Sequence, residues 1–176
     1  MSSSLTPRTK FSIHSFRKSF EQAYLISLFY LVIMLDVDRF ILPRTFLSIL
    51  IEHAQKSAPN ESVAIISGVI QDRTAITKQV FTPNNVDQST VSFTVDPHTL
   101  LAIYNAIEEA EQQLIGIFHT HPAPPYPSGT DRRFMEVNPY VWLISSTANP
   151  EKVKGFLLQK DGSLKEIELL IQNKRE

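Results

Sequence analysis

The chain has 176 residues, of which 43% are hydrophobic and 20% charged, a composition typical of globular proteins and not of disordered or collagen-like chains. Lys and Arg number 17 against 18 Asp and Glu, so no broad basic surface is expected for binding a nucleic-acid backbone. The chain contains no cysteine, which excludes disulfides and cysteine-containing zinc sites and is typical of a reducing, cytoplasmic environment. Any bound metal must therefore be held by histidine and carboxylate side chains.

Residues 1–36 differ in pattern from the rest, and we expect an N-terminal extension there. Its apolar run, Ala23 to Leu35, has 13 residues, whereas a bilayer-spanning helix needs about 20. Basic residues precede the run as in a secretion signal, but Asp36 and Asp38 follow it where a cleavage site would need small residues. An amphipathic appendage, a genuine anchor and a true start at Met34 stay open, and a membrane partner is not expected.

Hydrophobic periodicity predicts two helices in a single domain over residues 37–176. The first, over about 43–58, begins with Pro43 and has apolar residues at three- and four-residue steps. The second begins at Asp96-Pro97, an N-cap residue followed by a first-turn proline, and continues to about residue 112. No repeat or linker indicates a further domain.

Short apolar or alternating runs rich in β-branched residues predict the strands. The β-branched run from Val63 to Ile70 is typical of a strand buried on both faces, and Asp161-Gly162 is a hairpin turn signal. Strands are expected over residues 63–70, 74–81, 89–95, 113–118, 140–146, 153–159 and 164–171. The domain is therefore expected to be rich in strands, with two helices.

The stretch from His119 to Asp131 directly follows an apolar strand and combines the residue types of a metal site. Residues i and i+2 of an extended chain point to the same side, so His119 and His121 can direct both imidazoles at one point. Prolines in the following loop lower the entropy lost when the chain folds back to present Asp131 as a third ligand. Three protein ligands leave a fourth, tetrahedral position for water, as in catalytic zinc sites.

Each half of this motif also has a structural explanation. A His-x-His pair alone is weak, because it arises by chance in many sequences. Ser128 to Asp131 fits a capping box, with Ser128 as the N-cap of a short helix to about residue 136. The two readings are compatible, because a capped helix start is also a rigid support for Asp131. His53 and His98 are expected to be surface or packing residues, and Trp142 is expected in the core.

The order His-Thr-His-Pro, a proline-rich loop and Pro-Ser-x-x-Asp resembles the signature of the JAMM/MPN+ (JAB/MPN domain) zinc metalloproteases, in a compact, prokaryote-type version. The upstream half is similar as well, because His53-Ala54 is followed by Pro59, by Glu61 and by a strand that contains Gly68. The resemblance covers roughly residues 37–146. One departure is that nine residues separate the second histidine from the aspartate, one fewer than is usual in the family, which bears on metal affinity.

The resemblance implies an α/β (α+β) fold, with a single curved, mostly antiparallel mixed β-sheet flanked by two main helices in the MPN/JAMM (cytidine-deaminase-like) architecture. It implies one Zn²⁺ bound by His119, His121 and Asp131, with Glu61 as the general base toward zinc-activated water. Ser128 is then the hydrogen-bond donor to the carbonyl oxygen that becomes negatively charged. The reaction implied is hydrolysis after the C-terminal Gly-Gly of a ubiquitin-like modifier, which binds as an added strand.

Two other functions stay open at this point. A zinc hydrolase with the same site could release a small amino acid from a carrier protein, which substrate assays would distinguish. A non-catalytic MPN scaffold subunit would bind partners without metal, which a measurement of bound zinc would distinguish. Zinc deaminases are excluded by the absent cysteines, and helical metalloproteases by the absence of a His-Glu-x-x-His string.

Overall fold

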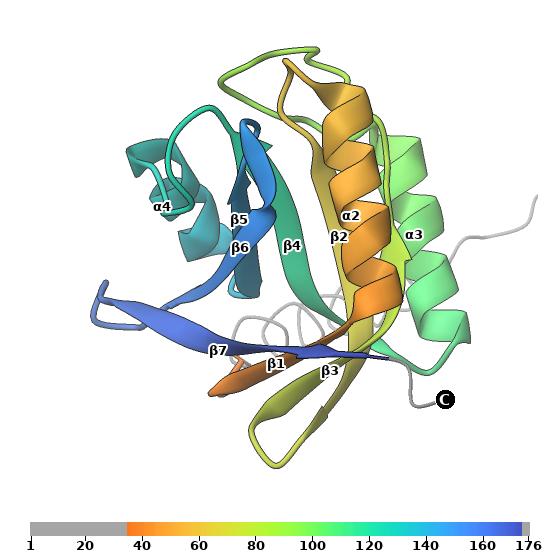
Figure 1. Cartoon of the computed structure of the whole chain (residues 1–176). Coiled ribbons are helices and arrows are strands. Elements are labelled where there is room, and N and C mark those ends of the chain that lie inside the picture. Colours follow the sequence, from red (N-terminus) through yellow and green to blue (C-terminus); the bar gives the residue numbers. More distant parts are fainter. Residues whose placement is uncertain (1–34, 174–176) are drawn as a thin grey trace, which may run out of the picture. The chain divides into compact units, whose positions relative to one another are not determined.

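The computed structural model describes residues 35–173 (Figure 1). The predicted N-terminal extension lies outside the described residues except for Leu35 and Asp36. None of the helices in the described part has the length and apolarity needed to cross a bilayer. In chain order the described elements are β1 (Arg39–Pro43), α2 (Arg44–Ser57), β2 (Val63–Gln71), β3 (Thr74–Phe81), α3 (Pro97–Glu109), β4 (Gln113–His121), α4 (Gly129–Val137), β5 (Val141–Ser146), β6 (Asn149–Leu158) and β7 (Leu164–Gln172).

The described strands form one mixed sheet that closes into a barrel in the order β1-β3-β2-β4-β5-β6-β7. The pairs β1–β3, β1–β7 and β4–β5 are parallel, and the pairs β2–β3, β2–β4, β5–β6 and β6–β7 are antiparallel. The predicted α+β class and mixed sheet are confirmed. The expectation of an open, curved sheet is corrected, because the sheet closes into a barrel. Besides the two main helices, the short helix expected after Ser128 is present as α4 and packs on this sheet.

Closure depends on β1, which the sequence did not predict. This strand has five residues, and two of them, Phe40 and Leu42, are fully buried. It pairs with β3 on one side and with β7 on the other. Pro43, expected at the first position of a helix, is instead the last residue of β1 and the N-cap of α2, with an extended backbone. Because Pro43 was assigned to the start of a helix, the short strand that it ends was not predicted.

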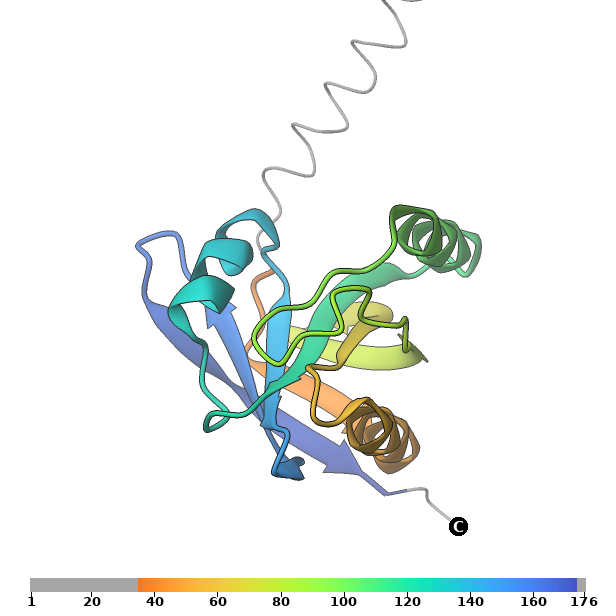
Figure 2. The same cartoon turned by 90° about the horizontal axis from the view of Figure 1, so that it is seen from above.

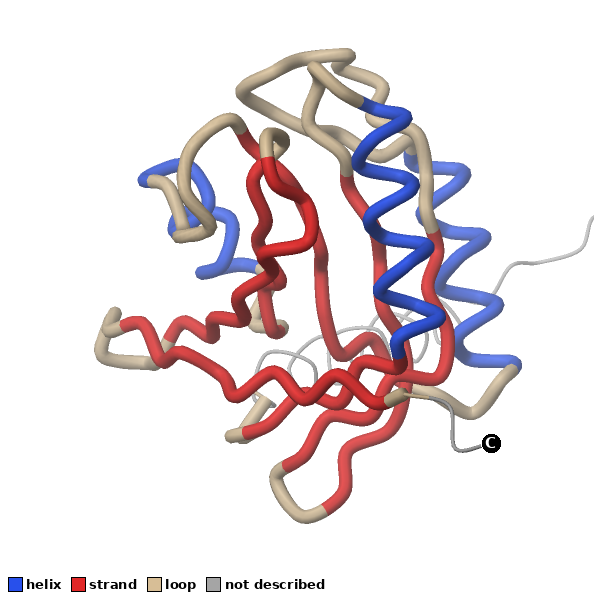
Figure 3. The backbone as a smooth tube through the Cα atoms, viewed as in Figure 1, coloured by secondary structure: helices blue, strands red, loops and turns tan. Residues whose placement is uncertain are grey.

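Helices cover the sheet on different sides (Figures 1 and 2). α2 and α3 lie to one side of β4 and β5, while α4 lies on the other side. Strands and helices alternate along much of the chain, as Figure 3 shows. The apolar residues of α2 pack into a large core with Ala64 and Ile66 of β2, whereas those of α3 pack with Ile65 of the same strand. The prediction that this strand is buried on both faces is confirmed.

The predicted strand over residues 89–95 is wrong. Residues 82–96 form a loop without helix or strand between β3 and α3. The side chain of Asn85 hydrogen-bonds the backbone of Ser92 and Thr94, in place of the neighbouring strand that a ladder would need. The alternation of Val91 and Phe93 is real, but Val91 is largely exposed and only Phe93 packs inward. The other predicted strands and both predicted helices are present, with boundaries shifted by a few residues.

Gly68, at a register irregularity of β2, provides a test of this packing. A Cβ there would overlap the backbone carbonyl oxygen of Ile76 on β3. We expect Gly68→Ala to lower the free energy of unfolding by about 1–3 kcal/mol, because the backbone must shift to relieve the overlap. Urea denaturation measures the effect. Gly129→Ala is the control, since nothing lies within 4 Å of a Cβ at that position; equal stability of the two variants would contradict the packing described.

Candidate functional site

Strand β4 ends with both candidate histidines. His119 and His121 lie two residues apart on this strand, and their ring centroids are 5.4 Å apart. Both side chains are buried. β4 lies between β2 and β5, so its end is supported by backbone pairing on both sides. The strand geometry therefore points both imidazoles to one place, as the spacing predicts.

Asp131 reaches the same place from the first turn of α4. Ser128 is the N-cap of this helix, and its Oγ accepts a hydrogen bond of 3.1 Å from the Asp131 backbone N–H. In return, the backbone N–H of Ser128 donates to Asp131 Oδ2 at 2.6 Å. The predicted capping box is confirmed. It fixes Oδ2 of Asp131 and leaves Oδ1 facing His119.

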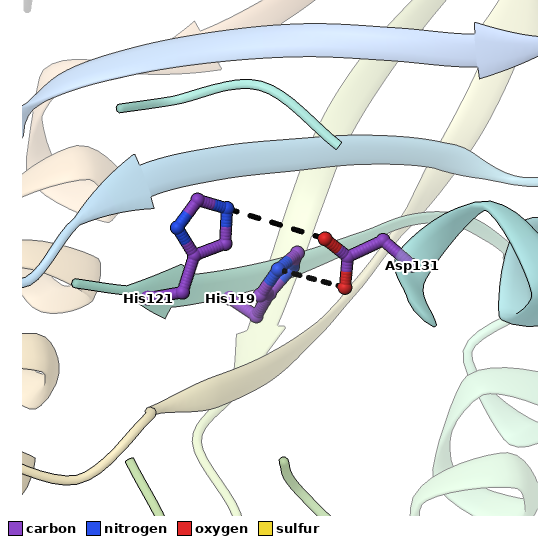
Figure 4. Close-up of side chains that lie close together, drawn as sticks. All are labelled: His119, His121 and Asp131. Carbon is purple, nitrogen blue, oxygen red and sulfur yellow. Dashed lines mark ion pairs between the residues drawn. The ribbon is translucent and has the colours of Figure 1, made fainter. Parts of the chain in front are cut away.

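His119, His121 and Asp131 form a buried cluster whose ligand atoms all lie within 4.8 Å of one another. Figure 4 shows the carboxylate of Asp131 facing both rings, with His119 Nε2 3.3 Å from Oδ1 and His121 Nε2 4.0 Å from Oδ2. The distance from His119 to Asp131 is close to the separation of about 3.4 Å between ligand atoms of a tetrahedral zinc with bonds of about 2.1 Å. The shorter loop does not keep the three side chains from meeting.

The hydrogen bonding of His119 also fits a metal. Within the described residues, neither ring nitrogen of His119 has a hydrogen-bond partner, although the side chain is fully buried. Buried polar atoms in folded proteins are nearly always satisfied, so an unpartnered pair of imidazole nitrogens needs a specific explanation. A cation held with His121 and Asp131 would account for Nε2, the nitrogen that faces Asp131. The donor set, two imidazoles and one carboxylate, is one that zinc uses in catalytic sites.

The proline-rich loop holds His121 from the other side. Its Nδ1 accepts a hydrogen bond of 3.2 Å from the Ala123 N–H, and its Nε2 lies 3.3 Å from the Tyr126 carbonyl oxygen. The Tyr126 ring in turn packs edge-on against Phe156, which anchors the loop to β6. Burial, followed by the charge of His119, lowers the pKa of His121. A lowered pKa favours the neutral ring, which is the form that binds metals.

Asp131 stays ionised. Burial alone would raise the pKa of its carboxyl group, but the interactions with His119 and the hydrogen bonds with Ser128 outweigh burial. The pKa of Asp131 therefore lies well below its usual value. A carboxylate that is negative at all ordinary pH values suits a cation ligand.

Glu61 lies beside this cluster because of the pairing between β2 and β4. Val63, two residues after Glu61, is directly opposite His119. Glu61 is only 7% exposed, and burial raises its pKa to about 6, with His119 opposing the shift and Asp131 adding to it. A carboxyl group with such a pKa exchanges protons readily near neutral pH.

Aromatic rings enclose the cluster. Phe93 of the loop over residues 82–96 stacks at 5.3 Å from His119, and Trp142 of β5 contacts His119 edge-on at 5.5 Å. The expectation of Trp142 in the core is confirmed. Both rings also line an apolar pocket of about 300 Å³ between α3, α4 and the sheet. The sequence around Phe93 predicts only a strand, because no local signal indicates that its ring packs on a histidine.

The two remaining described histidines lie outside the cluster. His98 is exposed in the first turn of α3. His53 on α2 is half-buried, and its Nε2 lies 3.0 Å from the carbonyl oxygen of Val63. Desolvation lowers the pKa of His53. Both positions agree with the surface or packing roles expected for them.

Residues 43–158 match the family described as prokaryotic homologs of the JAB domain. The chain belongs to this family. The resemblance to the JAMM/MPN+ (JAB/MPN) proteins in their compact, prokaryotic form is thereby confirmed.

Two relatives of this JAB domain carry the name desampylase. The protein from Pyrococcus furiosus is 31% identical over 121 residues, which cover 66% of this chain and 82% of the relative. The protein from Haloferax volcanii is 32% identical over 101 residues, which cover 55% of this chain and 73% of the relative.

Solved structures agree with the fold. The solution structure of a protein from Desulfitobacterium hafniense has a TM-score of 0.67 and 30% identity, over 78% of this chain and 95% of the other. That of a protein from Salinibacter ruber has a TM-score of 0.59 and 21% identity, over 75% and 90%, and supports the fold alone.

The cluster predicts one tightly bound Zn²⁺ per chain. We expect His121→Ala to weaken zinc binding by at least about 100-fold, because a ligand is lost from a site that needs three. His98→Ala removes an exposed histidine from the same protein and should leave zinc binding unchanged. Competition with a chelator of known affinity measures both, and stoichiometric, tight zinc in His121→Ala would rule out this ligand set.

Proposed function

We propose that this JAB domain is a zinc-dependent isopeptidase or peptidase that hydrolyses the bond after the C-terminal Gly-Gly of a ubiquitin-like modifier. The observation that carries the proposal is the meeting of His119, His121 and Asp131 beside Glu61, whose pKa burial raises to about 6. The two relatives named desampylase support removal of a protein modifier as the reaction. The cysteine-free sequence agrees with a cytoplasmic setting, and neither nucleic acid nor membrane enters the proposal.

His119, His121 and Asp131 would hold the ion. When bound in such a site, zinc lowers the pKa of water and polarises the carbonyl group under attack. The buried carboxylate of Asp131 balances part of the charge of the cation. The surrounding rings of Phe93 and Trp142 limit the access of bulk water, which strengthens every electrostatic interaction in the site.

Glu61 is the proposed general base. Its carboxylate accepts a proton from the attacking water and, once protonated, passes it to the amine that leaves. A pKa near 6 suits both steps, because the group is mostly ionised at neutral pH and is still basic enough to take the proton. Its position beside the cluster follows from the pairing of Val63 with His119.

Ser128 is the proposed donor to the developing oxyanion. Its Oγ accepts a hydrogen bond from Asp131 N–H, which leaves the hydroxyl proton free to be donated elsewhere. Ser128 is exposed, so a substrate carbonyl can reach it. Loss of a comparable donor in other acyl-transfer enzymes costs about 2.7–4 kcal/mol of transition-state stabilisation.

The loop over residues 82–96 is the proposed platform for the extended tail of the modifier. The backbone groups of Ser92 and Thr94 are bonded to Asn85 and Val86. Since successive residues of an extended chain direct their backbone groups to opposite sides, those of Phe93 point the other way. An added strand can pair there. The apolar pocket beside Phe93 has room for side chains of that tail.

Cleavage of a ubiquitin-like protein fused after Gly-Gly tests this function. We expect the zinc-loaded chain to cleave the fusion and a chelator to abolish cleavage. Glu61→Gln should bind zinc normally yet lose about 10²–10⁴-fold in kcat, because the base is removed and the ligands are kept. Glu109→Gln, an exposed acid at the end of α3, is the matched control and should stay fully active.

Each outcome of that experiment decides between functions. A zinc-loaded Glu61→Gln variant with full activity would falsify the assigned base. A zinc-loaded chain that ignores Gly-Gly fusions but releases amino acids from a carrier protein would support the alternative hydrolase. Failure to bind zinc would support a non-catalytic scaffold.

The pH dependence of kcat/KM tests the base separately. The active form of Glu61 is the carboxylate, so kcat/KM should fall as the pH falls through the pKa of Glu61. Burial raises that pKa to about 6, and a nearby cation would bring it down again. We therefore expect an acid limb with a midpoint at or below about pH 6, and a midpoint above pH 7 would contradict the assignment.

A further inference from the structure

Both the amide nitrogen and the amide oxygen of the Asn85 side chain make two hydrogen bonds each. Its Nδ2 donates to the carbonyl oxygens of Glu61 at 3.1 Å and Ser92 at 3.0 Å. Its Oδ1 accepts from the backbone N–H groups of Asp87 and Thr94, each at 3.1 Å. A side-chain amide has two N–H donors and two acceptor lone pairs, so Asn85 is fully satisfied. One half-buried residue thus joins the loop over residues 82–96 to the proposed base.

The hydrogen bond from Asn85 holds the main chain of Glu61, which no strand of the sheet holds. β2 begins only at Val63, so the peptide groups on both sides of Glu61 lie outside its ladder. The loop holds both of them, because Glu61 N–H donates to the Ser89 carbonyl at 2.8 Å and the Glu61 carbonyl accepts from Asn85. From Ser62 onward, β4 takes over through a hydrogen bond from Ser62 N–H to Thr120 Oγ1 at 3.1 Å.

The same loop reaches the other half of the site. Phe93 lies between Ser92 and Thr94, the two loop residues whose backbone Asn85 bonds directly, and its ring packs on His119. Asn85 therefore fixes two things with one amide: the main chain of the proposed base and the segment that covers a proposed ligand.

We propose that Asn85 is a positioning residue that aims the carboxylate of Glu61 at the reaction centre by fixing the backbone of Glu61. Asn85 is not one of the proposed metal ligands and acts through the main chain of Glu61. The inference rests on the proposed function of Glu61. A carboxylate displaced by about 1 Å from the proton it must take is expected to cost about 100-fold in rate.

Asn85→Asp separates the two halves of the amide. The variant keeps an oxygen where Asp87 and Thr94 donate. It loses the donor to the carbonyls of Glu61 and Ser92 and places a negative charge against them. We expect kcat to fall about 10- to 100-fold, with KM changed less than threefold and zinc stoichiometry unchanged. Hydrogen exchange at Glu61 N–H should be at least tenfold faster, while exchange along β4 stays as in the original chain.

Asp87→Ala is the matched control. The Asp87 carboxylate accepts hydrogen bonds from the hydroxyls of Ser92 at 3.2 Å and Thr94 at 2.9 Å, so its loss loosens the same loop without touching Glu61. Because this loop is also the proposed platform for the tail of the modifier, we expect any loss of activity in KM, with kcat within twofold and unchanged exchange at Glu61 N–H. Asn85→Ala, which adds no charge, replaces Asn85→Asp if that variant does not fold.

The outcomes separate this inference from the proposed function. If the original chain cleaves Gly-Gly fusions and Asn85→Asp does so with the same kcat, the positioning role is wrong and the function stands. If Asp87→Ala loses as much kcat as Asn85→Asp, general loosening of the loop explains the effect, and the role is also wrong. If the zinc-loaded original chain cleaves no fusion, the proposed function fails, and the exchange rate at Glu61 N–H alone decides whether Asn85 fixes this backbone.

Discussion

The antiparallel pairing of β2 with β4 is the constraint on which the candidate site depends. It places Val63 opposite His119. Glu61, just before β2, and the two histidines at the end of β4 therefore lie at the same edge of the sheet. The buried hydroxyls of Ser62 and Thr120, 3.0 Å apart, join the two segments at the same level. A slip of one residue would turn both imidazoles to the opposite face of the sheet. The apolar cores on the two faces of β2 hold this register. They therefore fix the direction of the imidazoles as well as stabilising the fold.

The site combines groups that folding alone would not bury. Glu61, His119 and Asp131 are charged or polar and lie among apolar side chains. Burial of such groups costs free energy unless they are paired, so they are expected where binding or catalysis needs them. The capping box shows how one arrangement serves both demands. Ser128 satisfies the first turn of α4 and, by the same two hydrogen bonds, orients the carboxylate of Asp131.

Local signals predicted most of the elements. The N-cap at Asp96, the capping box at Ser128 and the β-branched run of β2 each act within a few residues of the chain, and all three are present in the structure. β1 was missed because its pairing partners, β3 and β7, are distant in the sequence and a five-residue strand has little pattern of its own. The segment over 89–95 was mistaken for a strand because alternation says nothing about whether a neighbouring strand is available.

The sequence alone predicted the three candidate metal ligands and their spacing. His119 and His121 share one side of a strand and Asp131 follows a helix cap, because strand and cap geometry are properties of adjacent residues. Three further features came only from tertiary contacts: closure of the barrel, burial of Glu61, and the bond from Asn85 to a carbonyl 24 residues away. Each joins segments far apart along the chain, and such contacts exist only once the sheet has assembled in register.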